Sequence, residues 1–270
     1  MPAHPLRSGA LRMLAAAAAS LALAQGVSAL SPVPQRSNSE IDVQLFYQVL
    51  IGEIELRTGD AGNAYQVILD AARRTRDEAL FRRATDIALG ARAGDQALAA
   101  VQAWRLAVPS SIEAQRYLVQ MLVALNRLPE TVEPLRALIG LAPAAERAAL
   151  IASLPRFFAR TTDRAQAATL LEQALTPYVD APETRSAART AMGRAWLLVP
   201  DTAKALALAQ RAHGLDPAAI DPAGLALDLL PSSPAAEAVV TGHLAARPDS
   251  HAVRLGYVRV LAASQRYAEA

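Results

Sequence analysis

The sequence contains no cysteine among its 270 residues. This absence excludes disulfide bonds, zinc sites built on cysteine and a thiol nucleophile. It also excludes a lipid-modified N-terminal cysteine, so we do not expect membrane attachment by that route.

Aromatic residues make up only 4% of the chain, although hydrophobic residues make up 53%, because alanine fills most of the apolar class. Alanine is the best helix former, and its small side chain lets two helix backbones approach closely. Alternating runs of Val, Ile, Thr and Tyr, which would indicate strands, are missing. The composition therefore predicts an all-α protein.

The chain also lacks an excess of charge of either sign, with 27 basic and 25 acidic residues. Arg7 and Arg12 lie in a leader that we expect to be removed, which leaves 25 basic against 25 acidic residues. A near-neutral exported chain is a poor nucleic-acid binder, so no such partner is expected. Lys204 is the only lysine, and the preference for arginine fits a GC-rich coding bias at least as well as a binding role.

Motifs of catalysis are missing as well. No glycine cluster precedes Lys204, as a phosphate-binding loop would require, and neither G-x-S-x-G nor H-E-x-x-H occurs. His213, His243 and His251 have no partner His or carboxylate at metal-ligand spacing on a shared face. His213 falls in the last turn of an expected helix, where a cation interacts favourably with the dipole. We therefore expect no catalytic residue, metal or cofactor, and no enzymatic activity.

Residues 1–29 have the features of a secretory signal peptide. Arg7 and Arg12 form a positive segment, Met13–Ala24 is a short apolar core, and Val27–Ala29 offers small residues for cleavage after Ala29. An uncleaved anchor is the alternative, but spanning a bilayer needs roughly 20 apolar residues. With a composition typical of bacteria, the predicted location is the periplasm.

Residues 30–40, LSPVPQRSNSE, are rich in proline and serine and show no periodicity. We expect a flexible linker there, followed by a helical repeat array over residues 41–270. No transmembrane segment is expected in the mature chain.

The stretch Ala187–Pro217 shows how the array is built. Two apolar helical patterns flank a break at Val199–Thr202, Asp201 is placed to cap the second helix, and Pro217 ends the unit. Small residues occupy the positions where two helices would touch: Gly193, Ala205, Ala209 and Ala212. This stretch resembles one tetratricopeptide repeat, a helix–turn–helix of about 34 residues.

The pattern recurs through the chain with a mean spacing of about 34 residues. The small residues that open each second helix are Ala64, Ala100, Thr131, Ala167, Ala205, Ala238 and Ala270. The close-contact residues of the first helices are Gly52, Ala88, Val119, Pro155, Gly193, Ala226 and Val258. The resemblance thus covers about seven units, the last truncated, and implies a right-handed superhelical solenoid of antiparallel helix pairs, with about fourteen helices.

Some units depart from the pattern. We expect Pro155 to kink or break the first helix of unit four, and Pro134 to do the same to the second helix of unit three. Unit six begins late, at Asp221, so its first helix should be short. Tyr267–Ala270 is expected to start a further second helix, with no polar capping unit after it. We therefore expect the sequence to be a piece of a longer protein.

By the same resemblance, the first helices line a concave groove, and the residue after each close-contact position points into it. These residues are Glu53, Leu89, Gln120, Arg156, Arg194, Leu227 and Arg259. Arg116 and Arg160 lie at neighbouring positions that face the groove. Because arginine suits carboxylates, the groove is a candidate site for an acidic or C-terminal segment of a protein partner. The alternative is that arginine is simply the solvated cation that this chain uses.

The leading hypothesis is a periplasmic scaffold or adaptor that binds segments of partner proteins. A second is the N-terminal repeat domain of a longer cell-envelope protein, such as a polysaccharide exporter with a C-terminal outer-membrane barrel. A third is an enzyme whose catalytic domain lies beyond Ala270. The sequence leaves the partner, the pathway and the oligomeric state open.

Overall fold

The computed structural model of the protein describes residues 43–199 and 202–270, within a compact unit that spans Ile41–Ala270. The described residues form thirteen α-helices and four short 3₁₀-helices, and they contain no strand. The predicted all-α class is confirmed. The predicted leader (1–29), the linker (30–40) and the capping role of Asp201 lie outside the described residues.

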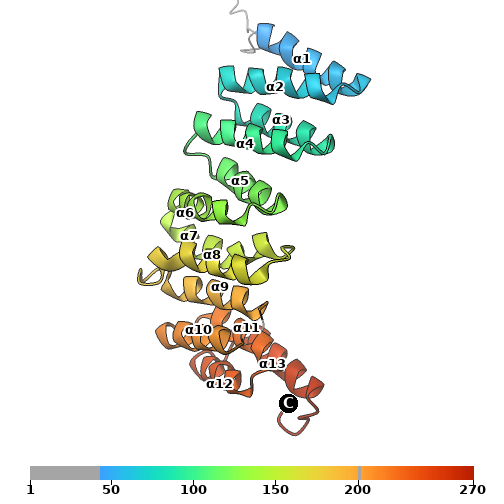
Figure 1. The fold of residues 1–270 in the computed structure, drawn as a ribbon. Helices are drawn as coiled ribbons and strands as arrows, with labels where there is room; N and C mark the ends of the chain where they lie inside the picture. The colour runs from blue at the N-terminus through green and yellow to red at the C-terminus, as the bar shows by residue number, and fades with distance from the viewer. Residues whose placement is uncertain (1–42, 200–201) are drawn as a thin grey trace, which may run out of the picture. The chain divides into compact units, whose positions relative to one another are not determined.

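The helices alternate along the chain between a first and a second helix, and consecutive helices stack on one another (Figure 1). The first helices are α1 (Val43–Thr58), α3 (Glu78–Gly90), α5 (Ile112–Ala124), α7 (Ala144–Ser153) continued by η2 (Leu154–Phe158), α9 (Arg185–Leu197), α11 (Ile220–Leu229) and α13 (His251–Ala263). The second helices are α2 (Ala61–Thr75), α4 (Gly94–Ala107), η1 (Leu128–Thr131) with α6 (Val132–Leu141), α8 (Arg164–Leu175) with η3 (Thr176–Tyr178), α10 (Thr202–Leu215) and η4 (Pro234–Ala236) with α12 (Glu237–Ala246).

Side-chain caps fix where several helices begin. The carboxylate of Asp60 accepts a hydrogen bond from the backbone N–H of Asn63 at 2.9 Å, and that of Asp163 accepts one from Gln166 at 2.9 Å. Each bond satisfies an N–H group that has no partner within its helix. The turn before α2 contains Gly59 with a φ of 96°, which only glycine adopts without strain.

The small residues predicted to open the second helices lie in the core in five of the described units, including Ala100 of unit two. Ala64, Thr131 and Ala205 have no exposed surface, and Ala167 is 4% exposed. The glycine of unit five permits the closest approach, because a Cβ atom on Gly193 would lie 2.4 Å from a methyl carbon of Leu225 and 3.4 Å from the carbonyl oxygen of Ala205. Close helix packing through small residues is therefore present as the sequence indicates.

The predicted register of unit two is wrong by three residues. The left-handed turn residue Arg92 precedes Ala97 by the same number of residues as Gly59 precedes Ala64. By the position of this turn, Ala97 is the opener and Thr85 the close-contact residue, in place of Ala100 and Ala88, although all four are fully buried. The sequence pattern did not distinguish Ala97 from Ala100 because α4 buries both of them.

The register of unit six is wrong by two residues. Ala238, the predicted opener, is exposed, whereas Ala236 is fully buried together with Val240 and His243. The cause is the 3₁₀-helix η4, which starts at Pro234 and advances by three residues per turn instead of 3.6. The short first helix predicted for this unit is confirmed, since α11 has ten residues.

The prolines act in two ways. Pro155 stands near the start of η2, and the α-helix α7 ends at Ser153, so the predicted break is confirmed. Pro134 lies in the first turn of α6, where an N–H group has no partner within the helix, and it is buried. The second helix of unit three is divided just before Pro134 into η1 and α6, in agreement with the predicted interruption.

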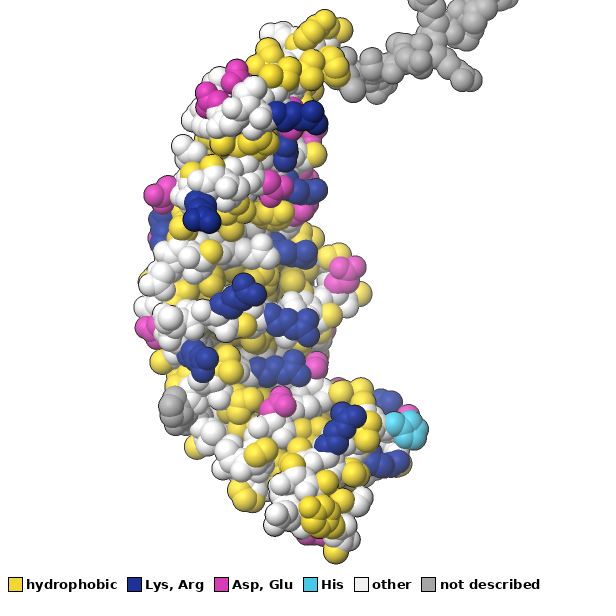
Figure 2. Space-filling model, turned by 90° about the vertical axis from the view of Figure 1, so that its right-hand side faces the viewer, with side chains coloured by type: hydrophobic (Ala, Val, Ile, Leu, Met, Phe, Trp, Pro, Cys, Tyr) yellow, Lys and Arg dark blue, Asp and Glu magenta, His cyan; other side chains and the backbone are white. Residues whose placement is uncertain are grey.

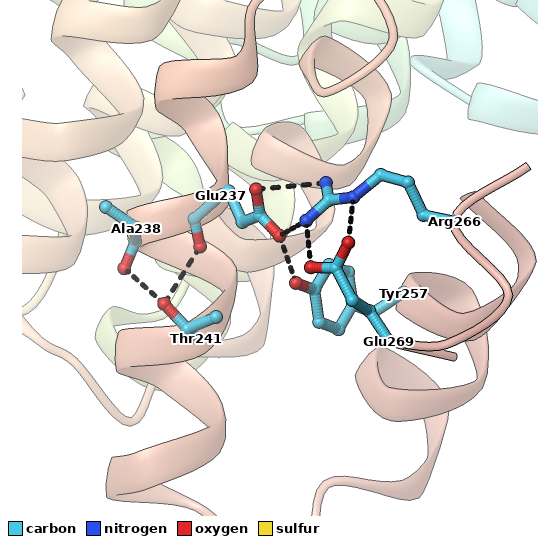
Figure 3. Close-up of polar contacts among 6 residues, drawn as sticks. All are labelled: Glu237, Ala238, Thr241, Tyr257, Arg266 and Glu269. Atoms are coloured by element: carbon cyan, nitrogen blue, oxygen red, sulfur yellow. Dashed lines mark hydrogen bonds and ion pairs between the residues drawn. The ribbon is translucent and has the colours of Figure 1, made fainter. Parts of the chain in front are cut away.

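Residues 267–270 form turns and not the predicted start of another helix. They are held by Arg266, whose guanidinium donates to Glu237 at 2.8 and 3.1 Å and also to Glu269 (Figure 3). The hydroxyl of Tyr257 donates to the same Glu237. Bonds from Arg266 and Tyr257 lower the pKa of Glu237, and burial followed by the bond to Glu237 raises the pKa of Tyr257 to about 12. This network anchors the final turns to α12 and α13.

Candidate functional site

The first helices carry a series of arginines that differ in what they contact. Figure 2 shows Lys and Arg side chains spaced down the unit from the α1 end, with hydrophobic side chains between them. We refer to the surface formed by the first helices as the first-helix face. An arginine on this face is available to another molecule only if its guanidinium is not already paired with a carboxylate of this chain.

On the first two units this face is closed by ion pairs. The guanidinium of Arg83 on α3 donates to both carboxylate oxygens of Glu53 on α1, at 2.7 and 2.6 Å. Across the next boundary, one terminal N–H of Arg82 donates to Glu113 on α5. The bond from Arg83 is the main cause that lowers the pKa of Glu53. The bidentate pair of Arg83 with Glu53 satisfies that cation within the protein.

Between α5 and η2 the face is open. A hollow of about 570 Å³ is lined by Arg156 and Arg160, with Gln120, Met121 and Phe157 among the other lining residues, and no carboxylate lines it. Neither arginine forms an ion pair with any residue in the described part of the chain. The hollow thus combines two exposed cations with an apolar wall.

The local sequence explains why the two arginines project outward. Pro155 ends the α-helical geometry, and the 3₁₀-helix η2 is anchored by Leu154 and Phe158, which are fully and almost fully buried. With these apolar side chains directed into the core, Arg156 and Arg160 are left on the surface. The break in the first helix therefore creates the hollow and places its charges.

The other three predicted groove residues lie elsewhere on the helical array. Arg116 on α5 and Arg259 on α13 are exposed but do not line the hollow. Arg194 on α9 is directed to the next first helix, where it lies 3.4 Å from the carboxylate of Asp221. The structure brings together Arg156 and Arg160, and it does not bring the other three to them.

Sequence reasoning missed two features of this face. The ion pair between Arg83 and Glu53 joins residues thirty positions apart, and only the repeat register would have aligned them. The corrected register also replaces Leu89 with Asp86 as the residue after the close contact of unit two. Phe157 in the hollow was signalled by the pair of phenylalanines that follows Pro155, but their two orientations depend on the 3₁₀ geometry of η2.

The histidines have structural environments. The ring of His243 is fully buried, with one nitrogen 3.0 Å from the carbonyl of Pro217 and the other 2.9 Å from the hydroxyl of Ser250. His213 is half-buried, and burial, followed by the nearby His243, lowers its pKa. Residues 43–199 and 202–270 contain no group of three or more His, Cys, Asp or Glu side chains placed to hold a metal ion.

None of the described helices is both long and apolar enough to cross a bilayer.

Among known proteins, similarity is found only to solved structures. No protein-family model matches the sequence, and no curated protein matches it. Among solved structures, PilW, a widely conserved type IV pilus biogenesis factor, is 15% identical with a TM-score of 0.37, over 80% of this chain and 99% of that one. TTC0263, a thermophilic TPR protein of Thermus thermophilus, is 21% identical with a TM-score of 0.32, over 69% of this chain and 99% of that one.

The TPR domain of P58(IPK) is 11% identical with a TM-score of 0.32, over 84% of this chain and 65% of that domain. At these identities and scores the likenesses say nothing about function or particular residues. The helix pairs of the structure itself define the class: a helical-repeat protein built from units of the tetratricopeptide kind.

Proposed function

We propose that the protein is a protein–protein interaction scaffold that holds an acidic segment of a partner in the hollow between α5 and η2. Arrays of helix pairs present long surfaces to which extended segments bind. The observation that carries the proposal is the pair Arg156 and Arg160, which line the hollow without any carboxylate beside them. A partner that supplies the missing carboxylates satisfies both cations.

The hollow offers two kinds of contact to such a segment. A carboxylate of the partner accepts charge-assisted hydrogen bonds from the guanidinium groups, each worth about 1.5–3 kcal/mol when well formed and less in solvent. Met121 and Phe157 provide an apolar wall for a hydrophobic side chain next to the acidic one. The expected segment therefore combines acidic residues with at least one large apolar residue.

The proposal is tested with labelled peptides that carry Asp and Glu on both sides of a central Phe. Fluorescence anisotropy should show binding to the wild-type chain, and binding should weaken as added salt screens the charges. The double variant Arg156→Gln/Arg160→Gln should bind at least about tenfold more weakly, which corresponds to the loss of about one such hydrogen bond.

Two matched controls sharpen this test. The variant Arg73→Gln/Arg211→Gln removes two exposed arginines from the second helices α2 and α10 and should bind as the wild type does. A peptide with Asn and Gln in place of its acidic residues should not bind. Equal affinity of the acidic peptide for both double variants would refute the proposal.

We further propose that the scaffold acts in the periplasm after export. The support is the N-terminal sequence alone, with its arginines, its apolar core Met13–Ala24 and the small residues before Leu30. Mass spectrometry of the chain recovered from the periplasm of a bacterial host should give a mature start near Leu30. An intact Met1 on periplasmic material would contradict removal of the leader.

A further inference from the structure

The helix α1 presents an apolar stripe on the side turned away from the rest of the helical array. The stripe consists of Val43, Phe46, Tyr47, Leu50, Ile51 and Ile54, whose exposed fractions range from 42% to 68%. Their spacing places them on one face of a helix, because residues three and four apart lie above one another. The opposite side of α1 packs inward, where Gly52 is buried and Val49 and Leu56 contact the core. Figure 2 shows hydrophobic side chains gathered at this end.

No other element in the described ranges has a comparable surface. The remaining large hydrophobic residues that are exposed lie on separate elements: Leu89, Leu106, Leu198, Ile220, Leu255 and Tyr267. Single exposed apolar residues are normal on protein surfaces, whereas a contiguous apolar patch marks an interaction site. The stripe on α1 is therefore a site where another surface packs.

The stripe also lacks charge. No charged residue occurs from Val43 to Gly52, and the charged residues Glu53, Glu55 and Arg57 are confined to the C-terminal part of α1. Glu53 is already bound by Arg83. The surface that covers the stripe must accordingly be apolar and uncharged along most of its length.

We propose that this surface is the α1 stripe of a second copy of the chain, packed antiparallel across a two-fold axis. Such an interface is self-complementary, because each copy supplies the same patch. An antiparallel arrangement places Glu55 and Arg57 of the two copies at opposite ends of the interface. A parallel arrangement would set Glu55 beside Glu55, where like charges repel.

The available area is sufficient for such a dimer. Six side chains that are about half exposed, each with roughly 150–200 Å² of surface when free, offer on the order of 500 Å² per copy. Two copies then bury on the order of 1,000 Å², at the lower edge of specific interfaces. The opposite end of the unit is no match for the stripe, since Leu255 on α13 lies among the exposed charges of Arg254 and Arg259.

The first test is the mass of the full chain in solution, measured by sedimentation over a range of concentrations. The wild type should form dimers, and Phe46→Glu/Leu50→Glu should raise the dissociation constant by roughly 100-fold, because charges would face each other across the axis. The control Leu106→Glu/Leu255→Glu alters two other apolar residues that are exposed by more than half and should dimerise as the wild type does. Circular dichroism should be the same for all three. A wild type that stays monomeric, or equal dissociation constants for both variants, would overturn the proposal.

The second test uses the absence of cysteine, since a single introduced thiol reports on one position. In the antiparallel arrangement Leu50→Cys lies near the axis, and a short thiol-to-thiol cross-linker should join two copies. Val43→Cys lies opposite Ile54 of the other copy, and its two thiols are about 16 Å apart along the helix axis, so little product should form. Stronger cross-linking at Val43 than at Leu50 would overturn the antiparallel arrangement. Protection of the Leu50→Cys thiol from labelling in a monomer would overturn the dimer and show that another part of the same chain covers the stripe.

Discussion

On the first-helix face, the first two units and the segment around η2 differ in how their arginines are bound. In α1 to α4 the helices are regular, and the arginines of α3 are bound by carboxylates of the neighbouring first helices. From η1 to η3 the helices are interrupted by three 3₁₀ segments, each with a proline near its start. There Arg156 and Arg160 line a hollow that has no carboxylate.

One repeat position contributes to this difference. Gly52 precedes the left-handed turn residue Gly59 by the same number of residues as Val119 precedes Asn126. The residues that follow, Glu53 and Gln120, are therefore equivalent in the repeat. Glu53 is charged and closes its part of the first-helix face, whereas Gln120 is neutral and lies in the lining of the hollow. The absence of a carboxylate at this position thus distinguishes the candidate site from the closed part of the first-helix face.

Tight helix contacts are expected both in unit one and in unit five, next to the central units, and overfilling one contact in each tests this. Gly52→Leu would drive its side chain into Ile68, and Gly193→Leu into Leu225 and the backbone of α10. Each should lower the free energy of unfolding by about 1–3 kcal/mol. Urea denaturation measures the effect, with Gly140→Ala as the control, since a Cβ atom there meets nothing within 4 Å. Stabilities that match the wild type would show that these helices are not in tight contact.

A smaller difference is expected from removing charges. Arg82→Gln/Arg83→Gln removes two ion pairs of partly exposed groups and should destabilise the protein by about 0.2–1 kcal/mol per pair. Arg156→Gln/Arg160→Gln removes unpaired cations and should change stability by less than about 0.5 kcal/mol. The same urea experiment compares them. A larger loss in the second variant would mean that these arginines are held by the fold after all.

The smallest expected effect is a local response to acid. The pKa of Glu53 is lowered in the folded state, so its pairing stabilises the protein above the unfolded-state pKa, near about 4.3. This contribution is lost as the pH falls from about 5 towards the lowered pKa. Hydrogen exchange, corrected for intrinsic rates, should show α1 and α3 losing protection in acid, while the hollow has no carboxylate to titrate. In Arg83→Gln this loss should be reduced, and an unchanged loss would rule out the ion pair as its cause.

Much of the fold was predictable because the pattern of small residues recurs, and local propensity agrees with it. The register was not predictable in every unit. In unit two, alanine occurs at both Ala97 and Ala100, and the sequence cannot tell which of two buried alanines opens the helix. In unit six, η4 shifts the buried face from Ala238 to Ala236. Abundant alanine therefore predicts that helices pack closely, but it does not show which alanine opens each second helix.

The candidate site was predictable only in part. The resemblance pointed to Arg156 and Arg160, which line the hollow together. It also pointed to Arg194, whose contact with Asp221 depends on how α9 packs against α11. The periodicity of the apolar residues of α1 can be read from the sequence. The periodicity alone does not show which face of α1 turns away from α2, because the packing of the two helices in three dimensions decides it.

The central claim is tested most directly by restoring the missing carboxylate with Gln120→Glu. This variant gives the hollow the residue that closes the equivalent position in unit one, so its carboxylate should occupy Arg156 or Arg160. We expect unchanged helicity and a loss of at least about tenfold in affinity for the acidic Phe-containing peptide, measured by fluorescence anisotropy at low salt. Wild-type affinity in Gln120→Glu would contradict the claim that unpaired arginines in this hollow form the binding site.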